Sequence, residues 1–147
     1  MSLDAPTERQ IVARSAVMDT NRIVAFPAFA NLPPEELDEF AGAMREVEVA
    51  ADDTVVRADD YGTAIYFIEA GTADVLNDAG DAITALGPGD TFGEIGLLLT
   101  GLRTASVVAS TPMRLLSLSG QDFDGIRPRV PEVERALRRL ALDRAGQ

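Results

Sequence analysis

The sequence predicts a mainly β protein with flanking helices, in which about eight strands form a jelly-roll-like β-barrel or sandwich. Three observations predict this fold. Between residues 45 and 119, apolar and polar residues alternate in short runs rich in β-forming residues. Glycine or aspartate stands at most of the joints between these runs. Before and after this region, apolar residues recur at helical spacing, and 147 residues with 46% hydrophobic content suffice for one core.

The first expected element is a helix over residues 6–19. Residues 4–8 carry the aspartate, proline and glutamate that are typical of a helix start, and Ile11, Val12, Val17 and Met18 follow them. We therefore assign residues 1–23 to an N-terminal helical extension. Its apolar stripe is thin, so two roles stay open: packing back on the domain, or contact with a second copy or a partner.

A second helix is expected to begin at Pro34. Proline suits the first helical position, and Glu35 and Glu36 suit the positive end of the helix dipole. Apolar residues then recur three and four positions apart, which predicts one buried face. These residues are Leu37, Phe40, Ala41 and Met44.

The central region is expected to contain short strands with turns between them. The β-rich runs cover residues 47–50, 54–57, 64–69, 72–77, 82–86, 104–109 and 113–118. The turn signals lie at residues 52–53, 59–62, 70–71, 78–81 and 87–90. Many short strands at this spacing indicate a jelly-roll-like barrel or sandwich.

Two helices are expected after the strands. The first begins at residues 119–123 and ends at Pro128, and the second runs from Pro131 to about Arg144. The apolar face of the second helix consists of Val133, Leu137, Leu140 and Ala141.

Two absences from the composition exclude many kinds of chemistry. The chain has no cysteine and no histidine, so it offers no disulfide, no thiolate and no histidine ligand for a metal or haem. Nucleophilic triads that need histidine are excluded for the same reason. A carboxylate-based hydrolase remains as a distant alternative, but 24 acidic residues make chance pairs frequent. We therefore expect no enzyme, no metal and no cofactor.

The charge distribution argues against nucleic acid as a partner. Residues 1–119 carry 19 acidic residues and 7 arginines, and the whole chain has a net charge of −11. Such a field repels phosphate backbones. The N-terminus has no signal pattern and no apolar run reaches the roughly 20 residues of a membrane span, so we expect a cytoplasmic protein without membrane contact. All 13 cations are arginine, which favours a GC-rich bacterial genome.

Residues 92–107 contain the chemistry that would hold a small cyclic phosphate. Gly93 allows close approach of the backbone, and Glu94 offers acceptors for a sugar hydroxyl at the start of an apolar turn. Nine positions later, Arg103 can donate two hydrogen bonds to phosphate oxygens. The alternative is that Glu94 and Arg103 form a surface ion pair, which would contribute little.

This segment resembles the phosphate-binding cassette of the cyclic nucleotide-binding domain family, which includes catabolite-type regulators and the regulatory subunit of protein kinase A. The resemblance implies that Glu94 binds the ribose 2′-hydroxyl and that Arg103 pairs with the cyclic phosphate. The implied ligand-binding residues are Phe92, Gly93, Glu94, Ile95, Gly96, Arg103, Thr104 and Ala105. Gly96 and Leu102 depart from the commonest pattern, which has alanine and proline at these positions.

The same resemblance extends over about residues 24–145, so we assign residues 24–147 to a cyclic nucleotide-binding domain. Residues 26–37 are similar to the opening of that family. In the family, the C-terminal helix covers the bound base as a lid, which makes Leu137, Arg138 and Leu140 candidate lid residues. The alternative is that this helix packs on the barrel or on a second subunit.

The chain ends at Gln147, and no DNA-binding or channel segment follows the strands within it. We therefore expect a stand-alone sensor of the bacterial type, which binds cAMP in preference to cGMP and signals through a protein partner or a homo-oligomer. The family uses a threonine at the position of Thr104 in binders of either nucleotide. A degenerate domain that serves as a protein-interaction scaffold is the main alternative.

Overall fold

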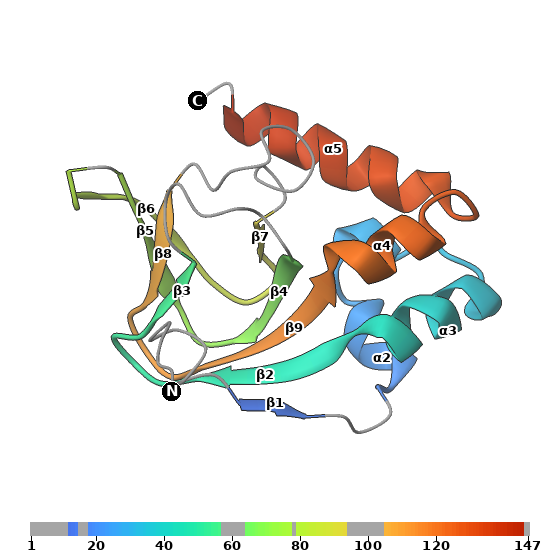
Figure 1. The fold of residues 1–147 in the computed structure, drawn as a ribbon, viewed down its shortest axis with the longest axis horizontal. Helices are drawn as coiled ribbons and strands as arrows, with labels where there is room; N and C mark the ends of the chain where they lie inside the picture. Colours follow the sequence, from blue (N-terminus) through green and yellow to red (C-terminus); the bar gives the residue numbers. More distant parts are fainter. Residues whose placement is uncertain (1–11, 15–17, 57–63, 78, 94–104, 146–147) are drawn as a thin grey trace.

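Two antiparallel sheets lie face to face, and helices pack on the outer side of one of them (Figure 1). The structure is a computed structural model that describes residues 12–14, 18–56, 64–77, 79–93 and 105–145. Within these residues, the five-stranded sheet has the order β1 (Val12–Arg14), β2 (Arg45–Val49), β9 (Met113–Ser119), β4 (Ala64–Ala70) and β7 (Thr91–Phe92). The four-stranded sheet has the order β3 (Thr54–Val56), β8 (Ser106–Ala109), β5 (Ala73–Leu76) and β6 (Ala82–Leu86). This arrangement confirms the predicted jelly-roll-like sandwich.

The space between the two sheets is filled by apolar side chains from both, most of them small or branched. We call these residues the intersheet cluster: Val47, Val49, Val55, Val56, Ile68, Ala73, Leu86, Phe92, Val107, Ala109, Met113 and Leu115. Along β9, Met113 and Leu115 belong to this cluster, as expected for residues that share one face of a strand.

The other face of the five-stranded sheet is also buried, because the helices cover it. The helical cluster consists of Met18, Ile23, Phe26, Phe29, Phe40, Ala41, Met44, Ile65, Phe67, Leu116, Leu118, Phe123, Ile126, Val130, Val133 and Leu137. β4 supplies residues to both clusters, with Ile65 and Phe67 on the helical side and Ile68 on the intersheet side. This double burial explains why β4 reads as a continuous apolar run rather than as a strict alternation.

The helical layer contains α2 (Thr20–Ile23), the 3₁₀ turn η1 (Pro27–Phe29), α3 (Pro34–Ala43), α4 (Gly120–Ile126) and α5 (Pro131–Ala145). Three of the helices, α3, α4 and α5, begin where the sequence predicts, whereas α2 and the 3₁₀ turn η1 were not predicted. Pro34 and Pro131 occupy first helical positions, and the Ser119 side chain accepts a hydrogen bond from the Asp122 backbone at 3.1 Å. None of the described helices combines the length and the apolar character that crossing a membrane requires.

The predicted helix over residues 6–19 is wrong at Val12–Arg14, which form β1. This strand pairs antiparallel with β2, with Val12 opposite Glu48 and Arg14 opposite Glu46. The weak apolar stripe gave a helix little to bury, whereas the edge of β2 offers backbone hydrogen bonds. Residues 1–11 and 15–17 lie outside the described part of the chain, and the first described helix is α2.

Candidate functional site

The predicted nucleotide-binding motif joins the two sheets. Its first residue, Phe92, lies on β7 at the edge of the five-stranded sheet and is 3% exposed. Gly93 follows with φ +90°, a conformation that favours glycine. At the other end of the motif, half-buried Ala105 directly precedes β8 of the four-stranded sheet. The motif therefore starts on one layer of the sandwich and ends on the other.

The turn before β7 is held by a dense set of hydrogen bonds. The backbone N–H of Gly87 donates to the Asp90 carboxylate at 2.9 Å, and the Asp90 N–H donates to the Gly87 carbonyl at 3.0 Å. The Ile68 N–H donates to the Asp90 carbonyl at 2.9 Å, which ties the turn to β4. These bonds confirm the turn that the sequence predicts at residues 87–90.

β7 itself was not predicted, because a strand of two residues is too short to show an alternating pattern. It pairs with β4, so that Phe92 lies opposite Tyr66 and Thr91 lies opposite Phe67. The rings of Tyr66 and Phe92 stack, with centroids 5.1 Å apart and an interplanar angle of 19°. An aromatic contact thus holds the first residue of the motif.

Five of the predicted ligand-binding residues lie outside the described part of the chain: Glu94, Ile95, Gly96, Arg103 and Thr104. Their roles stay predictions. Among the residues that the structure does describe, no group of three or more acidic, histidine or cysteine side chains could hold a metal ion.

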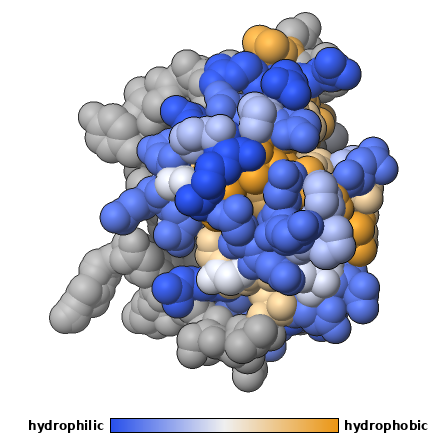
Figure 2. All heavy atoms as spheres, turned by 90° about the vertical axis from the view of Figure 1, so that its right-hand side faces the viewer, coloured by the Kyte–Doolittle hydropathy of each residue, from blue (hydrophilic) through white to orange (hydrophobic). Residues whose placement is uncertain are grey.

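The three candidate lid residues have different environments on α5. Leu137 is 1% exposed and belongs to the helical cluster, so it packs in the core in this structure. Arg138 donates a hydrogen bond to Glu134 at 2.8 Å, and Leu140 is half-buried. α5 is therefore anchored by Val133 and Leu137 in its first half. Figure 2 shows the side of the molecule that carries the helices, where hydrophilic side chains predominate.

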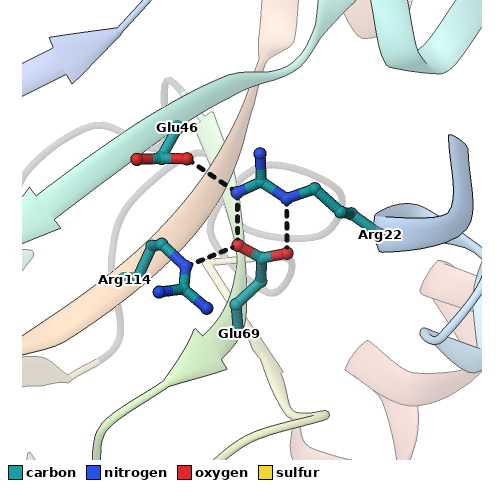
Figure 3. Close-up of polar contacts among 4 residues, drawn as sticks. All are labelled: Arg22, Glu46, Glu69 and Arg114. Carbon is teal, nitrogen blue, oxygen red and sulfur yellow. Dashed lines mark hydrogen bonds and ion pairs between the residues drawn. The ribbon is translucent and has the colours of Figure 1, made fainter. Parts of the chain in front are cut away.

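A charged cluster that no sequence pattern predicts lies at the edge of the helical layer. Four side chains from α2, β2, β4 and β9 converge there (Figure 3). Arg22 donates from Nε to Glu69 at 2.8 Å, from Nη2 to the same carboxylate at 2.5 Å, and from Nη2 to Glu46 at 2.8 Å. Arg114 donates to Glu69 at 2.9 Å. The cluster ties the short helix α2 to three strands.

Glu69 is the more buried member of the Arg22–Glu69 pair, and its surroundings change its pKa. Its side chain is only 11% exposed, while that of Arg22 is 31% exposed. Burial alone would raise the pKa of Glu69, but the hydrogen bonds from Arg22 and Arg114 outweigh burial and lower the pKa. The bonds to Glu69 likewise raise the pKa of Arg22. A glutamate directly after the apolar run of β4 was the available signal for this cluster.

We expect the stability of the protein to depend on the ionisation of Glu69. Because folding lowers its pKa below the ordinary value of 4.5, its stabilising effect is complete above that value. The effect is lost as the pH falls through the folded-state pKa. Glu69→Gln should therefore lower the free energy of unfolding at neutral pH and should flatten the decline of this free energy as the pH falls below 4.5. Urea denaturation at several pH values measures both effects.

Glu39→Gln is the matched control for this prediction, because Glu39 pairs with Arg129 at an exposed site. Exposed pairs contribute little, so this variant should follow the pH profile of the wild type. Parallel profiles for Glu69→Gln and the wild type would contradict the role of Glu69.

Comparison with known proteins identifies a family model and relatives that are similar to this chain. Residues 46–128 match the family model of the cyclic nucleotide-binding domain. The chain is 38% identical over 122 residues to the human potassium/sodium hyperpolarization-activated cyclic nucleotide-gated channel 4. This match covers 83% of the chain but 10% of the channel, so the chain spans about a tenth of that relative's length.

Solved structures of two relatives share the fold. The catabolite activator protein of Thermus thermophilus is 31% identical with a TM-score of 0.71, and the match covers 81% of this chain and 58% of that one. A variant regulatory subunit of a cAMP-independent protein kinase A from Trypanosoma brucei, bound to cAMP in its A site, is 26% identical. Its TM-score is 0.73, and the match covers 82% of this chain and 45% of the subunit. Because the family model spans more than half of the residues and these relatives share the fold, the chain belongs to the cyclic nucleotide-binding domain family.

Proposed function

We propose that the protein binds a cyclic nucleotide as a regulatory module, with cAMP favoured over cGMP, and that it is not an enzyme. The observation that carries this proposal is the motif of residues 92–107, in which Glu94 and Arg103 stand at the family spacing. Glu94 would accept a hydrogen bond from the ribose 2′-hydroxyl, and Arg103 would pair with the cyclic phosphate. The preference for cAMP is supported by the regulatory domain of Toxoplasma gondii protein kinase A, a relative 27% identical whose co-crystal structure contains cAMP.

The overall charge of the chain makes Arg103 important for this function. A net charge of −11 opposes the approach of an anionic ligand, so binding needs a local cation at the phosphate. Arginine suits this role because it stays protonated and presents several donors in a fixed fork. Added salt screens the long-range repulsion, but it acts less on a close arginine–phosphate contact.

Arg103→Leu is expected to weaken cAMP binding about 100-fold. Hydrogen bonds to charged groups contribute about 1.5–3 kcal/mol, and every 1.4 kcal/mol changes the affinity about tenfold. Isothermal titration calorimetry with cAMP and with cGMP measures the change and the base preference together. Arg45→Leu, the same substitution at an exposed position on β2, is the matched control and should bind like the wild type.

The alternative function, a protein-interaction scaffold, predicts that the wild type binds neither nucleotide. If neither nucleotide gives heat or shifts the melting temperature at millimolar concentration, the domain is a protein-interaction scaffold with a degenerate site. Equal affinity of the wild type and Arg103→Leu would also contradict the proposed site, because the phosphate would then have another partner.

The signal is proposed to leave the module through a protein partner or a second copy of the chain. The names of two relatives support this view, since one is a cyclic nucleotide-gated channel and the other is the regulatory subunit of a protein kinase. A ligand can drive the change only through its different affinity for the two conformations. Size-exclusion chromatography with and without cAMP tests whether self-association is the output.

A further inference from the structure

We infer that Tyr66 is a positioning residue for the cyclic nucleotide site, because its stack on Phe92 determines where the motif begins. Tyr66 lies outside the motif, on β4, and nothing in the motif's own sequence points to it. The inference rests on the proposed function, because it concerns the affinity of the same site. It follows from three features of the structure around β7.

The first feature is the shortness of β7. A strand of two residues forms few hydrogen bonds to its neighbour, so its side chains contribute a large share of what holds it. Phe92 lies directly opposite Tyr66 in the ladder, and the two rings are 5.1 Å apart and nearly parallel. Directly opposite pairs are the closest side-chain contacts between antiparallel strands. The stack is therefore a main contact of the last residue of β7.

The second feature is the asymmetry of the surroundings of Tyr66. Its partner on β9 is Ser117, a small residue, whereas its partner on β7 is the large ring of Phe92. Phe92 is 3% exposed and belongs to the intersheet cluster, against which Tyr66 packs. A shorter side chain at position 66 would leave space beside the Phe92 ring, and that ring would be free to shift toward β9.

The third feature is the short covalent path from the stack to the motif. Gly93 follows Phe92 with φ +90°, so the chain changes direction immediately after the stacked ring. On the other side of β7, the hydrogen bonds at Asp90 hold the turn to β4. With that end fixed, a shift of Phe92 passes to Gly93, which is itself a predicted ligand-binding residue. Small displacements of positioned groups reduce the strength of their contacts with a ligand.

The test compares three variants by calorimetric titration with cAMP, alongside thermal unfolding. Tyr66→Leu removes the ring and keeps an apolar side chain, and it should weaken cAMP binding about five- to tenfold. Tyr66→Phe keeps the stack and should stay within about twofold of the wild type. Phe26→Leu is the matched control, since Phe26 packs edge-on against Phe67 with centroids 5.3 Å apart on the opposite face of the sheet. It should lower the melting temperature without changing the affinity.

Each outcome decides the question. Tyr66→Leu with the affinity of the wild type overturns the inference and leaves the proposed function intact. Equal losses of affinity in Tyr66→Leu and Phe26→Leu also overturn it, because general destabilisation would then be the cause. A loss in Tyr66→Phe as large as that in Tyr66→Leu would assign the effect to the hydroxyl and not to the stack. A wild type that binds neither cAMP nor cGMP overturns the proposed function, and the inference with it.

Discussion

Phe67→Ala is expected to lower the free energy of unfolding by about 4 kcal/mol, the typical cost of truncating a buried phenylalanine. Phe67 is fully buried on the helical side of β4. Its ring contacts Phe26 at 5.3 Å and Phe29 at 5.2 Å between centroids, and Phe29 in turn contacts Phe40 at 5.0 Å. The substitution would open a cavity between the sheet and the helical layer. Urea denaturation followed by circular dichroism measures the loss.

Ile83→Ala is the control for this effect, because Ile83 is 59% exposed on the edge strand β6. Substitutions at exposed positions usually change stability by less than about 0.5 kcal/mol. If Phe67→Ala cost no more than Ile83→Ala, the aromatic contacts would not be what joins the helical layer to the sheet. Leu137 of α5 belongs to the same cluster, so Phe67→Ala also weakens the anchor of the C-terminal helix.

Gly71→Ala is expected to lower the free energy of unfolding by about 3 kcal/mol. Gly71 lies between β4 and β5 with φ +89°, which costs an alanine about 1–2 kcal/mol. A Cβ there would also lie 2.3 Å from the Pro112 carbonyl oxygen and 2.8 Å from the Met113 Cα. Both atoms belong to the backbone at the start of β9, so relieving the contact must displace a central strand, at a further cost of about 1–3 kcal/mol.

Gly80→Ala separates the cost of the positive φ from the cost of the close contact with β9. Gly80 has a similar φ of +86°, but nothing lies within 4 Å of the Cβ that alanine would add. This variant should therefore lose only the conformational contribution, about 1 kcal/mol. Chemical denaturation of both variants gives the difference directly. Equal losses would show that the close approach of Gly71 to β9 is relieved without cost.

Elements whose signals are local could be predicted from the sequence. The starts of α3 and α5 follow from Pro34 and Pro131, and the start of α4 follows from Ser119, because a helix cap involves residues within one turn. The alternating runs likewise predict the strands of the central region, since burial of one face repeats every second residue. The prediction was wrong at Val12–Arg14, where the structure has β1. That strand depends on β2, which lies more than 30 residues later in the chain.

The residues of the candidate site likewise divide into those that a local pattern predicts and those that only distant contacts bring together. The sequence by itself determined the family and the motif, because Gly93, Glu94 and Arg103 lie close together in the chain and their chemistry is readable from their spacing. Only the tertiary structure decided which residues support the motif and the helices. Tyr66 meets Phe92 because two strands pair, and Arg22 meets Glu69 across 47 residues because α2 packs at the edge of the sheet. Such contacts depend on how distant segments bury their apolar faces together, and no local pattern encodes that outcome.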